Sequence, residues 1–155
     1  ARMTDFPERG SVSVDIAAPL DTVWALVSDI TRMGEWSPEC VGAEWLEGAT
    51  EAAVGAAFLG HNKAATFEWS VPCEVVECDP GRTFEFVAPR GETMLTHWRF
   101  DFAPSADGTG TTLTESFDAP RINLAGAPSN FEGRYEMLIA GMTTTLGNIK
   151  AAAEG

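Results

Sequence analysis

The chain opens with a stretch in which polar and apolar residues alternate, the pattern of a strand with one buried face. This alternation covers residues 11–17 and predicts a strand that ends at Ala18-Pro19. Apolar residues then recur at positions 20, 23, 24, 27 and 30, which is the i, i+3, i+4, i+7 spacing of an amphipathic helix over 20–30. A second short helical turn is expected over 31–36, before Pro38.

The middle of the chain predicts a series of strands joined by short turns. Turn residues such as Asp79-Pro80-Gly81 separate the alternating segments. Strands are expected at 41–47, 55–62, 65–78, 82–88, 93–103 and 111–118. Strands connected in this way pair as an antiparallel meander.

The last segment returns to helical spacing. Ser129 and Glu132 form a capping box, with Ser129 as N-cap, and predict the start of a helix. An apolar stripe follows at Phe131, Tyr135, Leu138, Met142, Leu146 and Ile149. The stripe would bury one face of a long helix against the sheet. The order of elements predicts an α+β fold made of one sheet and one helical layer.

Length and charge narrow the possible functions. The 155 residues, 45% of them hydrophobic, suffice for one domain with a core and a cavity. We expect residues 1–10 to be an N-terminal extension and residues 11–155 to be a single domain, present as a monomer or a homodimer. The formal net charge of −13 repels phosphate backbones and anionic bilayers, so neither nucleic acid nor membrane insertion is expected.

Motifs for metal, cofactor or nucleophile chemistry are missing from the sequence. The three cysteines, Cys40, Cys73 and Cys78, form no Cys-x-x-Cys pair, which argues against disulfides and structural zinc. His61 and His97 fall on outward strand positions and have no partner at metal-ligand spacing. We therefore expect no metal and no cofactor. The cysteine usage and the lack of a secretory pattern at residues 1–7 favour a cytoplasmic location.

Several segments resemble one known superfamily both in their residues and in their order along the chain. They are Val-Trp-Ala-Leu-Val-Ser-Asp-Ile at 23–30, Gly-Glu-Trp-Ser-Pro-Glu-Cys at 34–40, Gly60-His61-Asn62, Phe67-Glu68-Trp69 and Thr111 to Phe117. Over about residues 10–153 the chain resembles the START/Bet v 1-like (SRPBCC) superfamily, and within it the bacterial polyketide cyclase/dehydrase-like branch.

The resemblance implies a helix-grip fold, and residues 11–155 would be a START/Bet v 1-like ligand-binding domain. In that fold a curved seven-stranded antiparallel sheet wraps around a long C-terminal helix, with two short helices after the first strand. An elongated apolar cavity usually lies between sheet and helix. Members bind lipids, sterols, polyketides or plant hormones, and a minority catalyse cyclisation, aromatisation or dehydration. The fold alone does not name the function.

Such a cavity would be lined by the inward faces of the strands and the apolar face of the last helix. These side chains either fill the core or form aromatic walls around a ligand. The predicted lining is Trp36, Phe58, Asn62, Phe67, Trp69, Phe84, Phe86, Met94, Thr96, Trp98, Phe100, Glu115, Tyr135, Leu138 and Met142. Trp36 belongs either to a simple helix-to-strand corner or to a gate at the cavity end.

Three polar residues on this face are the candidates for catalysis: Glu115, Asn62 and Tyr135. Alternation places Glu115 in phase with Leu113 and Phe117, and a carboxyl buried without a partner raises its pKa. Glu115 would then contact a ligand or act as an acid/base, unless an arginine, the backbone or a bulge satisfies it. The Tyr135 hydroxyl makes either a structural hydrogen bond or one into the cavity.

Three functions remain open at this point. The first is binding of a small hydrophobic or aromatic metabolite, lipid- or polyketide-like, for transport, sequestration or protection. The alternative is a polyketide cyclase, aromatase or dehydratase. The resemblance implies that cyclases tend to place an arginine in the cavity. The strand arginines here, Arg82 and Arg99, occupy an ambiguous and an outward position, which counts against cyclase chemistry. The third is a protein-interaction module with an acidic surface. Loop 119–128 is a candidate lid.

Overall fold

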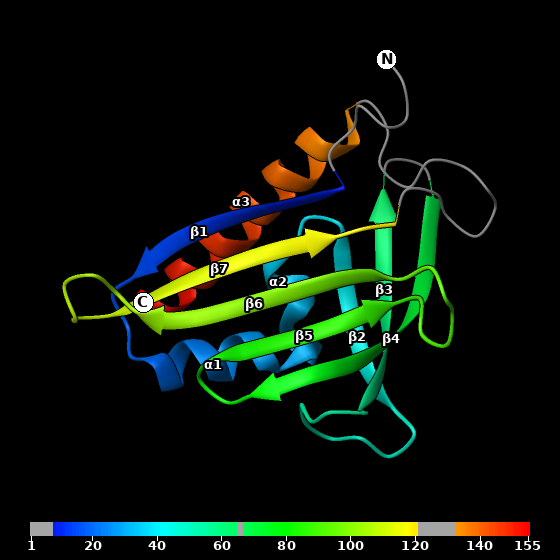
Figure 1. Cartoon of the computed structure of the whole chain (residues 1–155), viewed down its shortest axis with the longest axis horizontal. Helices are drawn as coiled ribbons and strands as arrows, with labels where there is room; N and C mark the ends of the chain where they lie inside the picture. The colour runs from blue at the N-terminus through cyan, green and yellow to red at the C-terminus, as the bar shows by residue number, and fades with distance from the viewer. Residues whose placement is uncertain (1–7, 65–66, 121–132) are drawn as a thin grey trace.

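The computed structural model describes residues 8–64, 67–120 and 133–155 and shows one sheet with helices on one side (Figure 1). The elements in chain order are β1 (Arg9–Ile16), α1 (Leu20–Ser28), the 3-10 turn η2 (Ile30–Arg32), α2 (Met33–Trp36), β2 (Cys40–Leu46), β3 (Ala57–Ala64), β4 (Phe67–Asp79), β5 (Thr83–Ala88), β6 (Thr96–Pro104), β7 (Thr111–Asp118) and α3 (Arg134–Glu154). The predicted α+β helix-grip fold is confirmed.

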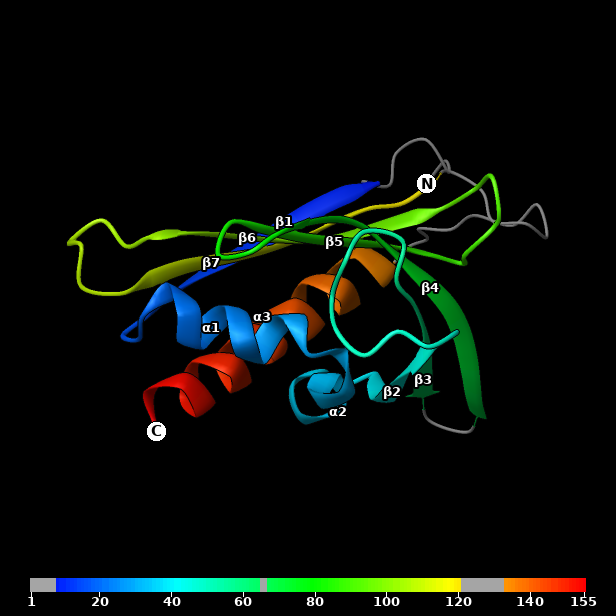
Figure 2. The ribbon, with the colours of Figure 1, turned by 90° about the horizontal axis from the view of Figure 1, so that it is seen from below.

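The sheet has seven strands in the order β1-β7-β6-β5-β4-β3-β2, and every neighbouring pair is antiparallel. Strands β2 to β7 follow one another as a meander, and β1 completes the sheet beside β7. Figure 2 shows the sheet as one layer and the helices together beneath it, with β2, β3 and β4 bending down toward α2. The bend makes the inner face concave.

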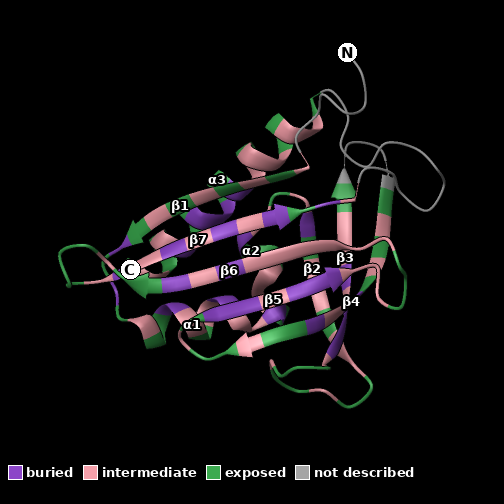
Figure 3. Cartoon of the chain, in the orientation of Figure 1, coloured by how far each residue is buried: buried purple, intermediate pink, exposed green. Residues whose placement is uncertain are grey.

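Strand alternation explains which side chains face the helices. Along β7 every second residue is buried, including Leu113, Glu115 and Phe117. The register places Phe84 opposite Phe100 and Phe86 opposite Trp98, so aromatic side chains lie across neighbouring strands on the same face. Figure 3 shows buried and intermediate positions alternating along β7. The sequence pattern therefore predicted the correct face for each of these strands.

The region after β1 differs in detail from the predicted continuous helix over 20–30. Helix α1 ends at Ser28 because Asp29 is extended, with φ −86 and ψ 92. The Asp29 carboxylate accepts a hydrogen bond from the Thr31 N–H at 3.1 Å and so caps the short turn η2. The helical turn expected over 31–36 is present as η2 followed by α2.

The long helix α3 packs against β1 and buries Met142, Leu146 and Ile149, as the apolar stripe predicted. It begins at Arg134 after Gly133, whose φ of 87 places it in the left-handed region. The predicted capping box at Ser129 and Glu132, the stripe position Phe131 and most of loop 119–128 lie outside the described residues. Among the described helices, none is long and apolar enough to cross a membrane.

Two glycines allow backbone segments to approach each other closely. A Cβ atom at Gly34 in α2 would lie 2.4 Å from the carbonyl oxygen of Val41, and one at Gly110 would lie 2.1 Å from that of Ile16. Because both obstacles are backbone atoms, a side chain would force the elements apart. Gly34 therefore sets how closely α2, which carries Trp36, rests on β2.

We expect Gly34→Ala to lower the free energy of unfolding by about 2 kcal/mol or more, since it overpacks a rigid contact. Gly147→Ala is the matched control, because Gly147 lies in α3 and a Cβ there meets nothing within 4 Å. That change should raise stability by about 0.5–1 kcal/mol through helix propensity. Urea unfolding of the two variants measures both effects, and equal stabilities would contradict the close-approach argument.

Candidate functional site

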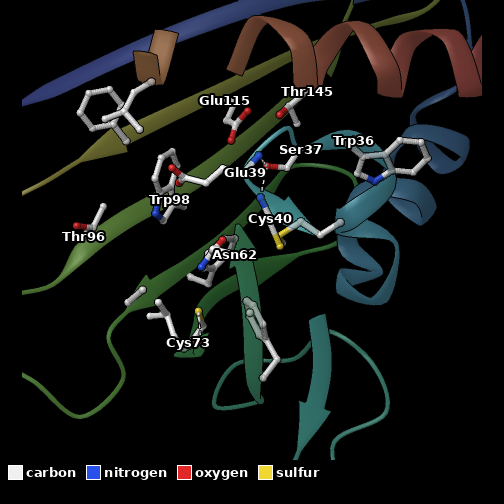
Figure 4. A pocket seen from close by; sticks show the side chains of 18 of the residues that line it. Trp36, Ser37, Glu39, Cys40, Asn62, Cys73, Thr96, Trp98, Glu115 and Thr145 are labelled. Carbon is white, nitrogen blue, oxygen red and sulfur yellow. Dashed lines mark hydrogen bonds between the residues drawn. The ribbon is translucent and has the colours of Figure 1, made fainter. Parts of the chain in front are cut away.

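A cavity of about 460 Å³ lies between the sheet and helices α2 and α3. This volume falls within the range of pockets for small organic molecules. Figure 4 shows side chains from β3, β6, β7 and the α2–β2 corner arranged around the same space. The walls are largely aromatic, and Phe58 meets Phe86 edge-on with ring centroids 5.1 Å apart.

Most of the predicted lining residues are brought together at this cavity. The inward positions of β3, β4, β5, β6 and β7 all contribute, with one residue from α2 and one from α3. They are Trp36, Phe58, Asn62, Trp69, Phe86, Thr96, Trp98, Phe100, Glu115 and Leu138. Strand alternation was the signal that identified nearly all of them.

The other predicted residues lie elsewhere. Phe84 is on the inner face but is fully buried beneath α1, where Trp24 packs on its ring at a centroid distance of 6.2 Å. Tyr135 and Met142 do not line the cavity and pack in an apolar cluster around Phe117, beside the cavity. Met94 precedes β6, which starts only at Thr96, so the predicted strand over 93–103 began too early. The side chain of Phe67 lies outside the described part of the chain.

Glu115 is the most unusual polar residue at the cavity. It is 7% exposed, and its neighbours across the sheet are Phe100 on β6 and Val12 on β1. Its Oε1 atom is buried without a hydrogen-bond partner among the described residues. Desolvation by burial raises the pKa of this carboxyl to about 8. At neutral pH the group is therefore mainly a neutral acid, which can donate a hydrogen bond.

The remaining neutral polar groups are spread around the aromatic walls. Asn62 on β3 and Thr96 on β6 both line the cavity, whereas the Thr145 hydroxyl donates to the carbonyl oxygen of Gly141 at 2.8 Å. The indole Nε1 of Trp36 is buried without a partner among the described residues. A ligand that offers hydrogen-bonding groups would compensate such unpaired atoms.

Sequence reasoning missed an ion pair in the cavity wall. Arg134 at the start of α3 and Glu39 at the α2–β2 corner both line the cavity, and Arg134 Nη1 lies 3.1 Å from Glu39 Oε1. The arginines weighed from the sequence, Arg82 and Arg99, belong to the strand region, whereas Arg134 lies at the start of a helix. Arg134 lies four residues before Leu138, so the helical periodicity of α3 was the signal that could have revealed it.

The cysteines and histidines do not form a reactive centre. Cys40 and Cys73 are free thiols in the cavity wall, and desolvation raises the pKa of both, that of Cys73 to about 12. Such thiols are poor nucleophiles. His61 contacts Ser70 and Glu44, and His97 contacts Glu85, on the outer face, as predicted. The described residues contain no cluster of three or more metal-ligating side chains.

A helix-grip fold with a largely aromatic cavity between the sheet and the helices defines the class of protein, a fold of the SRPBCC type. The family described as "Polyketide cyclase / dehydrase and lipid transport" matches residues 8–154. The chain belongs to this family.

Other proteins share part of this sequence, and solved structures share its fold. The chain is 30% identical over 131 residues to the Mycobacterium tuberculosis protein Rv0088. The matched region makes up 84% of this chain and 55% of that protein. The chain thus spans about half the length of the curated relatives it matches. Protein CV1439 from Chromobacterium violaceum has a TM-score of 0.71 at 18% identity, covering 96% of this chain and 99% of that one. The di-domain ARO/CYC StfQ from the steffimycin biosynthetic pathway has a TM-score of 0.74 at 16% identity. That match covers 98% of this chain and 52% of the StfQ chain.

Burial of Glu115 predicts a pH-dependent stability. Its folded-state pKa of about 8 lies above the ordinary value of 4.5, so between these values the folded state binds more protons than the unfolded state. The stability of the native chain therefore falls as pH rises through this window, by up to about 1.4 kcal/mol per pH unit.

Glu115→Gln should abolish this contribution, so its stability advantage over the native chain grows from pH 5 to pH 8. Urea unfolding at pH 5, 6.5 and 8 measures the difference. Glu92→Gln, at an exposed position between β5 and β6, is the control and should leave the pH profile unchanged. A constant difference across the pH range would contradict the buried-acid interpretation.

Proposed function

We propose that the protein binds a small, largely apolar or aromatic metabolite in its cavity and uses the neutral Glu115 acid to hydrogen-bond a polar group of that ligand. The observation that carries the proposal is the buried Glu115 carboxyl, whose Oε1 atom has no hydrogen-bond partner among the described residues, within an aromatic cavity of about 460 Å³. Transport, sequestration and protection of the ligand are the roles that such binding would serve.

A ligand can supply the hydrogen bond that the Glu115 Oε1 atom does not receive from the described residues. A buried carboxyl without a hydrogen bond costs free energy that a ligand carbonyl or hydroxyl can recover. The aromatic rings of Trp98, Phe86 and Phe100 offer flat apolar surface for the rest of the ligand. Asn62 and Thr96 supply further hydrogen-bonding groups, which favours a ligand with several oxygens over a plain hydrocarbon chain.

A glycine in the cavity wall gives a direct test. Gly60 on β3 lines the cavity, and a Cβ placed on it meets only the Val71 carbonyl oxygen, at 3.8 Å. Gly60→Leu should therefore fill the cavity and lower ligand affinity at least tenfold while the protein stays folded. The measurement is native mass spectrometry of protein purified from its own host, followed by identification of the released compound.

The matched control is Gly42→Leu on the neighbouring strand. Gly42 pairs with the outward-facing His61 and lies outside the cavity, and a Cβ there meets nothing within 4 Å. This variant should carry the same compound in the same amount as the native protein. If Gly60→Leu also carried it undiminished, the ligand would bind elsewhere and the proposal would fail.

The same acid favours a second function, proton transfer in a polyketide cyclase or dehydratase. A carboxyl with a pKa of about 8 is suited to exchange protons at neutral pH with a ligand beside it. In this case Glu115→Gln should lower product formation on a poly-β-keto substrate by about a hundredfold or more while substrate affinity stays similar. Equal turnover by the variant would exclude this role for Glu115.

A further inference from the structure

The cavity wall contains one cationic side chain among the residues that the structure describes. This is Arg134, which enters from the first turn of α3. A cation in an otherwise aromatic wall would normally favour a ligand carboxylate, because guanidinium and carboxylate groups form paired, charge-assisted hydrogen bonds. The state of Arg134 therefore decides which ligand charge the cavity accepts.

Glu39 already occupies the guanidinium of Arg134. The two side chains meet at two points, with Nη1 3.1 Å from Oε1 and Nη2 3.4 Å from Oε2. Both are partly shielded from solvent, at 23% and 34% side-chain exposure. A ligand carboxylate would have to displace Glu39 from this pair before it could reach Arg134.

The backbone on both sides holds Glu39 in this position. Its N–H donates to Ser37 Oγ at 3.2 Å, and its carbonyl oxygen accepts the N–H of Lys63 on β3 at 2.9 Å. Glu39 is thus fixed at the α2–β2 corner, beside the cavity (Figure 4). Because its backbone is held on both sides, Glu39 keeps its carboxylate within reach of Arg134.

The other ionisable groups in the wall are acids. They are Glu115, Cys40 and Cys73, and none of them carries a positive charge in either protonation state. The elements packed around Glu115 add no cation either, since β1 and β6 place Val12 and Phe100 opposite it and α3 contributes Leu138 and Thr145 to the same wall. With Arg134 neutralised, an anionic group entering the cavity would meet no free positive charge among the described lining residues.

We propose that Glu39 is a specificity-determining residue: by holding Arg134, it makes the cavity select uncharged aromatic ligands over their carboxylate analogues. The proposal rests on the ligand-binding function proposed above and adds the charge class of the ligand. A phenol or aromatic ketone fits this site, whereas a fatty acid or an aromatic acid does not.

The test compares two probes of the same shape, 2-acetylnaphthalene and 2-naphthoate, by equilibrium dialysis at pH 7. The native protein should bind the ketone at least tenfold more tightly than the carboxylate. In Glu39→Gln, Arg134 is left with an uncompensated charge, so affinity for the carboxylate should rise about tenfold while affinity for the ketone changes little. The double variant Glu39→Gln, Arg134→Gln should return to the native preference.

The control is Glu77→Gln, which removes the same type of partner from Arg99 on the outer face and should alter neither affinity. A Glu39→Gln variant that weakens or strengthens both probes equally would show a merely structural role and overturn the inference. Equal binding of both probes by the native protein would overturn this inference alone. If the native protein bound neither probe, the proposed function would fall with it.

Discussion

The size of the inner sheet face is the constraint on which the rest of this structure depends. Seven strands spaced about 4.8 Å apart span nearly 30 Å, whereas a helix with its side chains is only about 10–12 Å wide. Helix α3 can therefore cover one part of the concave face, beside β1 and β7. Helix α1 covers another part over Phe84 and Phe102, and the space between the covered parts and the bent strands is the cavity.

Within that space the protein keeps a residue that weakens its own fold. Glu115 could be an apolar residue like its strand neighbours Leu113 and Phe117, and the native state would then lose no free energy to a dehydrated carboxyl. Unfavourable groups of this kind are concentrated at functional sites, where a ligand or a reaction compensates for them. The position of Glu115 at the cavity, away from the packed cluster beneath α1, agrees with that rule.

The sequence predicted the fold and most of the cavity because both follow from local periodicity. Alternation with a period of two correctly placed Phe58, Asn62 and Glu115 on the inner face. Periodicity did not show which part of that face α1 would cover, so Phe84 was assigned to the cavity although it is core. The pairing of Arg134 with Glu39 joins residues 95 positions apart and depends on how α3 crosses the sheet. No local pattern encodes that crossing.

The distribution of tryptophan gives the molecule a built-in optical reporter. Of its five tryptophans, Trp36, Trp69 and Trp98 line the cavity, whereas Trp24 and Trp45 pack against phenylalanines of the core. The emission of an indole depends on the polarity and the quenchers around it, so occupancy of the cavity would alter three of these fluorophores at once. The other two indoles, which do not line the cavity, provide an internal reference, and ligand exchange can therefore be followed in real time without a label.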